Sequence, residues 1–436
     1  MRYFSTNGEQ SGASLEEAVL RGLAPDGGLY MPARLGGDAG TCMEGEELKK
    51  MSPVEIGCKV ARMFFAEDLP GEVIERIVQE TLAFEIPLVP VEGGIYSLEL
   101  YHGPTMAFKD VGARFMARLL AYFTSKKGMD EVHVLVATSG DTGSAVANGF
   151  LGVEGIKVHV LYPKGKVSAI QECQFTTLGN NVTALEIDGV FDDCQRLVKA
   201  AFSDRSLTSV MTLTSANSIN IARLLPQSFY YFIGLSQLER MTGEKAKTVI
   251  AVPSGNFGNL TAGIIAHRIG LGDVRFIAAN NRNDVFLQYL RTGQYHPRPS
   301  VATLANAMDV GDPSNFVRIY HLFNRSHAAI RNHISGYRYD DREIADAISR
   351  TWELTGYLLD PHGACGYLSL KQGLGKGERG FFLETAHPAK FKDTVQPLIP
   401  GTVDIPPTLQ AFMKGQKKTV PLSARYDDFK DYLLAL

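Results

Sequence analysis

Lys109 is the side chain best placed for chemistry, because it lies between an apolar residue, Phe108, and a carboxylate, Asp110. Burial beside Phe108 would favour the neutral form of its amine. A neutral amine attacks an aldehyde to form a Schiff base, so Lys109 is a candidate for covalent catalysis. Most lysines are solvated surface charges, and that alternative stays open for Lys109 taken by itself.

A turn rich in glycine and asparagine lies between a predicted strand at residues 248–252 and a predicted helix at 260–269. The turn consists of Ser254, Gly255, Asn256, Phe257, Gly258 and Asn259. Its glycines have no Cβ to block an anion, the next helix contributes its dipole, and the asparagines add donors. It lacks the lysine of a Walker loop and the spacing of a dinucleotide fingerprint, which argues against ATP and NAD. The turn predicts an anion site, with an ordinary strand-to-helix connection as an equal alternative.

A second turn with the same pattern lies between a predicted strand at 132–136 and a predicted helix at 144–150. It consists of Thr138, Ser139, Gly140, Asp141, Thr142, Gly143 and Ser144. Its hydroxyls and backbone donors suit a carboxylate or a phosphate, whereas Asp141 would repel an anion and is better placed to accept a hydrogen bond. The alternative is a capped helix in which Ser139, Asp141 or Thr142 accepts backbone N–H groups.

Sequence blocks spread over nearly the full chain resemble the threonine synthase family, in the branch typical of many bacteria and fungi. The blocks are 3–6 (YFST), 22–32 (GLAPDGGLYMP), 102–105 (HGPT), 108–110 (FKD), 138–143 (TSGDTG), 306–315 (NAMDVGDPSN) and 384–391 (ETAHPAKF). Several are specific to this family. The resemblance implies an enzyme dependent on pyridoxal 5′-phosphate (PLP) that converts O-phospho-L-homoserine and water to L-threonine and phosphate, the last step of threonine biosynthesis.

The resemblance also implies roles for the cofactor-binding residues. Lys109 would hold PLP as a Schiff base, and Thr385 would offer its hydroxyl to the pyridine nitrogen. The PLP phosphate would be bound by Gly255, Asn256, Phe257, Gly258 and Asn259. Asp141 stands where related enzymes carry an asparagine near the cofactor 3′-oxygen, which leaves its contact open. By itself, Thr385 after the predicted strand at 381–383 could equally be a strand end or a cap.

Substrate binding is also assigned from the resemblance. Asn217, Ser218 and Arg223 would bind the substrate phosphate, and Thr138, Ser139 and Thr142 would bind its carboxylate or share the phosphate. The guanidinium of Arg223 has a fork of donors suited to phosphate, but a solvated helix face is the alternative. In the implied mechanism Lys109 also acts as the general base at the α-proton. Either Lys109 or the departing phosphate activates the water, and the sequence does not choose between them.

The composition fits a globular enzyme with more than one domain. The chain has 436 residues, of which 45% are hydrophobic and 21% charged, enough for sizeable cores. A net charge of −3 without a basic tract argues against a nucleic-acid partner. No apolar run is long enough to span a membrane and no signal peptide is evident, so we expect a cytoplasmic protein. The sequence does not give the oligomeric state, and a monomer and a dimer both stay open. The ten histidines show no metal-binding spacing, and the cysteines, at 42, 58, 173, 194 and 365, suit reduced thiols.

The order of predicted elements indicates an α/β protein. Strands and helices alternate from 131 to about 215 and again from about 248, while the first 85 residues look helical, with a helix start at Ser14 and an amphipathic helix at 73–82. With the resemblance, this predicts a fold type II PLP enzyme, similar to the tryptophan synthase β-subunit, with two open parallel-sheet domains and a helical N-terminal lobe. The expected domains are 1–85, the N-terminal lobe; 86–130 with 216–436, the large PLP domain; and 131–215, a small α/β domain.

Three functions remain open at this point. The first is the synthase reaction, and the second is another fold type II lyase or dehydratase acting on serine, threonine or a phosphorylated amino acid. The third is a PLP- or phosphometabolite-binding protein without catalysis, because a site can outlive its activity on an unchanged fold. Release of phosphate from O-phosphohomoserine separates the first from the second.

Overall fold

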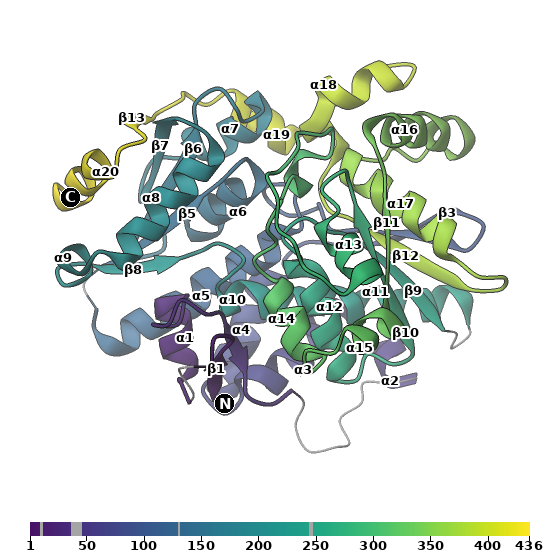
Figure 1. Ribbon diagram of the computed structural model, residues 1–436, viewed down its shortest axis with the longest axis horizontal. Helices are drawn as coiled ribbons and strands as arrows, with labels where there is room; N and C mark the ends of the chain where they lie inside the picture. Colours follow the sequence, from purple (N-terminus) through teal and green to yellow (C-terminus); the bar gives the residue numbers. More distant parts are fainter. Residues whose placement is uncertain (9–11, 36–45, 130, 244–246) are drawn as a thin grey trace. The chain divides into compact units, whose positions relative to one another are not determined.

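The computed structural model describes residues 1–8, 12–35, 46–129, 131–243 and 247–436 (Figure 1). Cys42 lies outside the described residues. The chain forms two compact units, and both are built on mainly parallel sheets with helices, which confirms the predicted α/β class. Unit 1 contains Met1–Arg2, Met31–Phe108 and Leu224–Asp404. Unit 2 contains Tyr3–Tyr30, Lys109–Arg223 and Ile405–Leu436.

Unit 1 has a six-stranded sheet that is parallel except for one edge strand. In spatial order its strands are β11 (Ile334–Arg338), β10 (Val274–Asn280), β9 (Thr248–Pro253), β12 (Arg379–Glu384), β4 (Ile95–Glu99) and β3 (Leu88–Glu92). Only β3 runs antiparallel to its neighbour. All six residues of β9 are buried, as expected for an inner strand of a parallel sheet.

The helices of unit 1 cover this sheet, and α17 (Pro361–Gly373) lies along β9, β10 and β12 (Figure 1). The others are α2 (Glu46–Lys50), α3 (Pro53–Phe65), α4 (Gly71–Thr81), η1 (Leu225–Ser228), α11 (Phe229–Thr242), α12 (Gly258–Arg268), α13 (Val285–Thr292), η2 (Asn306–Met308), α14 (Phe316–Leu322), α15 (His327–His333), α16 (Asp341–Thr355), η3 (Pro388–Phe391), α18 (Lys392–Val395) and η4 (Gln396–Leu398). Among these, α4 matches the helix predicted at 73–82.

Unit 2 has a five-stranded sheet in which every neighbouring pair is parallel. Its order is β13 (Val420–Ser423), β7 (Val182–Asp188), β6 (Ile156–Pro163), β5 (Val132–Ala137) and β8 (Thr212–Ser215). Its helices are α1 (Leu15–Arg21), α5 (Lys109–Lys127), α6 (Asp141–Phe150), α7 (Ala169–Thr176), α8 (Phe191–Ser203), α9 (Arg205–Thr208), α19 (Pro407–Met413) and α20 (Tyr426–Leu434), and α10 (Ile221–Leu224) lies at its boundary with unit 1. The start predicted at Ser14 is confirmed, because its side chain caps α1. Strands β1 (Tyr3–Ser5) and β2 (Tyr30–Pro32) form a separate pair.

The two units divide the chain differently from the expected domains, because contacts between distant segments decide the division. Residues 109–130, expected in the large domain, join unit 2, where α5 packs against α6. The C-terminal segment joins unit 2 as well, since β13 pairs with β7. The first 85 residues are split between both units and include two strands. No helix in the described parts of the chain is both long and apolar enough to cross a membrane.

Candidate active site

The turn at 254–259 joins β9 to α12, as the sequence predicts, and its backbone is fixed at both ends. Ser254 N–H donates to the carbonyl of Ala279 on β10 at 2.8 Å. Phe257 adopts a left-handed conformation with φ of 60°, which reverses the chain just before the helix begins at Gly258. The ring of Phe257 packs on Phe286 with 4.6 Å between centroids. This packing stabilises a backbone conformation that a bulky residue seldom adopts.

Asn259 presents an unused donor in this turn. The hydroxyl of Tyr231 donates to its Oδ1 at 2.8 Å, which fixes the orientation of the amide. The amide Nδ2 is buried and has no hydrogen-bond partner among the described residues. A buried donor without an acceptor is costly, so its presence at a glycine turn before a helix fits an anion such as the PLP phosphate.

The segment 306–315 lies directly against this turn. A Cβ at Gly255 would come within 2.7 Å of the Met308 Cα, so only glycine fits there. Ser314 N–H donates to the Asn256 Oδ1 at 2.6 Å, and Asn315 Nδ2 donates to the Asn256 carbonyl at 3.0 Å. The block that carried part of the resemblance is therefore a support for the turn.

Thr385 lies next to the turn in the sheet order, because β12 and β9 are parallel neighbours. Both segments leave the sheet at the carboxyl ends of their strands, where ligands bind in open α/β sheets. The Thr385 carbonyl accepts the N–H of Phe108 at 2.9 Å, and Ala107 and Ala386 form an isolated bridge. This pairing fixes the backbone immediately before Lys109, which is half-buried at the start of α5.

The turn at 138–144 in unit 2 uses most of its polar groups internally. The buried Thr138 hydroxyl accepts the N–H groups of Gly140 and Gly143 at 2.9 and 2.8 Å. The Ser144 hydroxyl bonds to the Gly140 carbonyl at 3.3 Å. Gly140 occupies the cap position of α6 and makes no side-chain cap, and the N–H of Gly143 in the first helical turn is accepted by Thr138, a residue that the capped-helix alternative did not name. These contacts hold the loop in shape.

The remaining hydroxyls and the carboxylate of this turn differ in exposure. Ser139 is exposed and Thr142 half-buried, so both can reach a ligand. Asp141 is buried, and its Oδ1 accepts the Gln171 Nε2 at 2.9 Å. The prediction that Asp141 accepts a hydrogen bond is confirmed, with Gln171 as its donor.

Arg223 is buried in unit 2, which overturns the alternative of a solvated helix face. Its Nη1 donates to the Ala216 carbonyl. A Cβ at Gly112 would lie 2.7 Å from the Arg223 carbonyl, so the arginine packs directly on the first turns of the helix that begins at Lys109. The structure thus brings Arg223 next to the Lys109 helix.

Asn217 and Ser218 follow β8, the neighbour of β5 in the parallel sheet. Asn217 Nδ2 donates to the Ala137 carbonyl, just before the 138–144 turn, at 3.0 Å. Ser218 is half-buried. Both segments therefore leave the same edge of the unit 2 sheet, as the predicted substrate role requires.

Several supporting residues could not be found from the sequence. Tyr231, Ala307 and His362 contact the cofactor turn or the segment behind it, and Gln171 holds Asp141. Each lies far from its partner in the sequence, and none belongs to a motif that indicates such a contact. Of these residues, only Ala307 lies in one of the sequence blocks that carry the family resemblance, the block at 306–315.

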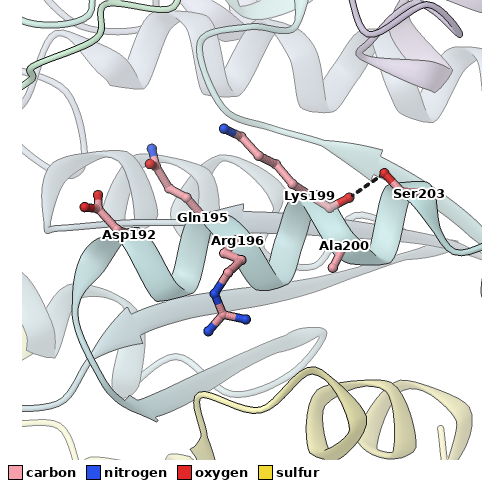
Figure 2. Close-up of a pocket in the computed structure, with 6 residues that line it drawn as sticks. All are labelled: Asp192, Gln195, Arg196, Lys199, Ala200 and Ser203. Carbon is pink, nitrogen blue, oxygen red and sulfur yellow. Dashed lines mark hydrogen bonds between the residues drawn. The ribbon is translucent and has the colours of Figure 1, made fainter. Parts of the chain in front are cut away.

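A hollow on the surface of α8 contains none of the predicted site residues (Figure 2). It is lined by Asp192, Gln195, Arg196, Lys199, Ala200 and Ser203, all from this one helix. The hydroxyl of Ser203 donates to the Lys199 carbonyl at 3.1 Å, an ordinary contact within a helix. The hollow combines no elements that could enclose a small molecule, so the strand ends remain the candidate site.

Comparisons with known proteins match nearly the whole chain. A family described as pyridoxal-phosphate dependent enzyme matches residues 81–383, and one described as threonine synthase N terminus matches residues 2–82. The chain is 43% identical to the threonine synthase of Escherichia coli (strain K12) over 409 residues, which is 94% of both proteins.

Solved structures show the same similarity over whole chains. The crystal structure of threonine synthase from Escherichia coli has a TM-score of 0.92 at 41% identity and covers 100% of both chains. The X-ray structure of PLP-bound threonine synthase from Brucella melitensis has a TM-score of 0.91 at 34% identity, over 99% of this chain and 98% of that one. The threonine synthase from yeast has a TM-score of 0.88 at 30% identity, over 100% and 99% of the chains.

Proposed function

Because the chain belongs to the threonine synthase family of PLP-dependent enzymes, we propose that Lys109 and the strand-end residues described above carry out that family's reaction. The chain is a PLP-dependent lyase that converts O-phospho-L-homoserine and water to L-threonine and phosphate. The observation that best supports the site is the buried Nδ2 of Asn259, which has no partner among the described residues, at a turn where Gly255 admits no side chain.

The cofactor contacts follow from the groups that unit 1 leaves available. Asn259 Nδ2 and the backbone N–H groups of residues 255–259 would bind the phosphate, and the Thr385 hydroxyl would meet the ring nitrogen. A neutral hydroxyl at that position does not require the nitrogen to be protonated. Lys109, the first residue of the unit 2 segment Lys109–Arg223, would hold the aldehyde of the cofactor through its amine. When bound, PLP supplies an electron sink for the reacting carbons of the substrate.

The proposed substrate contacts use donors at the strand ends of unit 2. Ser139 and Thr142 bind the substrate carboxylate, and Thr138 acts on them by shaping the loop. Arg223 attracts the substrate phosphate, with Asn217 and Ser218 as additional donors, because a guanidinium pairs well with phosphate.

Lys109 performs the proton transfers in this proposal. With substrate bound, the free amine of Lys109 would take the α-proton. Loss of the α- and β-protons lets the γ-phosphate leave, and water then adds at the β-carbon. The γ-carbon, which loses its bond to the phosphate oxygen, and the α-carbon each receive a proton to complete L-threonine, and Lys109 is the proposed donor. Either Lys109 or the released phosphate accepts the proton of the attacking water.

A coupled phosphate assay with O-phosphohomoserine tests this function. The wild type releases phosphate and threonine, and Lys109→Ala loses turnover by about three orders of magnitude or more, as expected for loss of a covalent catalyst. Lys127→Ala is the matched control, because Lys127 ends the same helix in a surface ion pair with Glu16. Full turnover in Lys109→Ala contradicts the assignment. Pyruvate or 2-oxobutyrate from unphosphorylated substrates supports a dehydratase, and a bound cofactor without any turnover supports a binding protein.

The substrate is a small molecule. The assembly state and the location of the enzyme are proposed separately. We expect a monomer or dimer in the cytoplasm, on the basis of the biosynthetic reaction. Light scattering after size-exclusion chromatography distinguishes these assembly states from larger ones.

A further inference from the structure

A buried polar network in unit 1 links the two ends of the proposed cofactor site. It consists of Glu384, Asp360 and His362, whose exposed fractions are 0%, 0% and 2%. Glu384 immediately precedes Thr385, the residue proposed at the ring nitrogen. At the other end, His362 contacts Ala307, which lies against the 254–259 turn. None of the three side chains takes part in the proposed proton transfers.

The contact with Ala307 connects His362 to the phosphate turn. Ala307 N–H donates to the Nε2 of His362 at 3.1 Å. A Cβ at Gly255 would lie 2.7 Å from the Met308 Cα and 3.0 Å from the Ala307 carbonyl oxygen, so this peptide limits the position of the turn. The N–H that donates to His362 and the carbonyl that faces Gly255 therefore belong to the same residue, Ala307.

The imidazole of His362 is fixed on both sides. Because Nε2 accepts a hydrogen bond, the ring proton lies on Nδ1. Nδ1 donates to the Asp360 Oδ1 at 2.5 Å, and the backbone N–H of His362 donates to the same oxygen at 2.7 Å. The ring of Phe391 packs on the imidazole with 4.9 Å between centroids. These contacts fix the orientation of the imidazole. The hydrogen bond from the Ala307 N–H to Nε2 in turn holds Ala307.

The other end of the network reaches the strand that presents Thr385. The backbone N–H of Asp360 donates to the Glu384 Oε1 at 2.7 Å. Gly363 makes room for this carboxyl group, since a Cβ there would lie 1.8 Å from Oε2. Burial, and then the nearby Asp360 carboxylate, raise the pKa of Glu384 well above its usual value.

We infer that His362, Asp360 and Glu384 form a positioning network that fixes the PLP phosphate turn relative to Thr385. The inference rests on the proposed function, because it takes the 254–259 turn and Thr385 as the cofactor contacts. His362 acts on the turn through Ala307 and is not a catalytic residue. The alternative is that Asp360 only caps α17, which it does by accepting the N–H groups of His362 and Gly363.

Two substitutions of His362 distinguish the roles of its two ring nitrogens. His362→Asn retains a donor near the Nδ1 position and removes the acceptor for Ala307, whereas His362→Gln retains an acceptor near the Nε2 position. The measurements on each holoenzyme are the phosphorus-31 NMR signal of the bound phosphate and the rate of cofactor release. We expect His362→Asn to shift the signal and release cofactor about tenfold faster, since one buried N–H loses its acceptor. His362→Gln stays near the wild type.

A second pair of variants separates positioning from helix capping. Asp360→Asn retains a capping oxygen but removes the charge that holds the imidazole. Asp340→Asn is the matched control, because Asp340 caps α16 by accepting the Glu343 N–H at 2.9 Å and has no histidine partner in the described structure. We expect Asp360→Asn to shift the phosphate signal and Asp340→Asn to leave it unchanged. Urea unfolding of all four variants shows whether a shifted signal merely follows lost stability.

Two outcomes overturn the network and leave the proposed function intact. One is a wild-type phosphate signal in both His362→Asn and Asp360→Asn. The other is an equal shift in His362→Asn and His362→Gln that scales with their loss of stability. A wild-type protein that binds PLP at a residue other than Lys109, seen by peptide mapping, instead contradicts the proposed function and this inference with it.

Discussion

The two glycine-rich turns look alike in sequence, but the structure uses their polar groups in opposite ways. In the 138–144 turn, the Thr138 hydroxyl binds the loop's own backbone and the Asp141 carboxylate binds Gln171. In the 254–259 turn, the protein satisfies the oxygen of Asn259 through Tyr231 and leaves the amide nitrogen without a partner among the described residues.

The first turn is therefore stabilised by its own hydrogen bonds. In the second turn one buried donor has no partner in the described structure, and we propose that a ligand accepts its hydrogen bond. Thr138 uses its hydroxyl to rigidify a turn in which Ser139 is exposed and Thr142 half-buried, and these two residues are the ones proposed to bind substrate. Asn259 instead keeps a buried donor for an outside acceptor. A glycine pattern alone therefore does not identify an anion site, and the buried donor of Asn259 is the additional observation that supports one here.

Of the substitutions that compare the two turns, Gly255→Ala should have the largest effect on cofactor binding. The added Cβ would meet the Met308 backbone at 2.7 Å, which cannot yield without moving the turn. We expect PLP affinity to fall about 100-fold, in line with the cost of overpacking. Fluorescence titration of the apoenzyme with PLP measures this. Gly71→Ala, at a helix start with no atom within 4 Å, should bind PLP normally. Wild-type affinity in Gly255→Ala would show that the turn does not hold the cofactor.

Thr138→Val should act on folding more than on the cofactor. Two buried N–H groups, those of Gly140 and Gly143, lose their acceptor, which we expect to lower the free energy of unfolding by about 2 kcal/mol. Urea unfolding measures the loss, and Thr138→Ser should restore it.

Ser139→Ala should raise the KM for O-phosphohomoserine without changing stability. If Thr138→Val alters KM alone, its hydroxyl binds substrate directly.

Tyr231→Phe tests how the amide of Asn259 is oriented. Without the hydroxyl the amide can rotate, so we expect PLP to dissociate about threefold to fivefold faster, the effect of one modest hydrogen bond. Stopped-flow transfer of cofactor to an apoenzyme acceptor measures the rate. Tyr339→Phe is the control, since that buried tyrosine bonds to Gln372 instead. Equal rates in Tyr231→Phe and wild type would mean that Asn259 needs no such support.

The smallest expected effect is a change of stability with pH, caused by a polar cluster in unit 2 that should not influence cofactor binding. His159 bonds to His133 at 3.1 Å and to the Tyr432 hydroxyl at 3.0 Å, and burial lowers its pKa to about 3. The unfolded chain takes up a proton below about pH 6.5 and the folded one does not, so stability is lost as pH falls.

One such histidine lowers the free energy of unfolding by roughly 0.7 kcal/mol between pH 7 and pH 6. Urea unfolding at both values checks this, and His159→Gln should lose less stability over the same interval. A pH slope that is the same in His159→Gln would assign it to other groups. PLP affinity should remain the same in both proteins.

The sequence predicted the local parts of this molecule well. The strand, turn and helix around 254–259 formed as expected, because hydrophobic runs and glycines act over a few residues. The chain segments that meet across the fold were harder to predict. The pairing of β13 with β7 joins residues more than 200 positions apart, and no local pattern indicates it.

The site shows the same limit. The family resemblance identified Lys109, Thr385 and the turn residues, but it did not reveal that Thr138 is consumed by its own loop. The partners Tyr231 and His362 carry no signal of their own, since an isolated tyrosine or histidine is usually an ordinary core residue. Their roles follow only from the three-dimensional contacts.

Borohydride reduction of the holoenzyme, followed by peptide mapping with mass spectrometry, tests the central claim most directly. The account predicts one reduced pyridoxyl group on the peptide that contains Lys109. An adduct on any other lysine, or no adduct in protein that turns over O-phosphohomoserine, would contradict it.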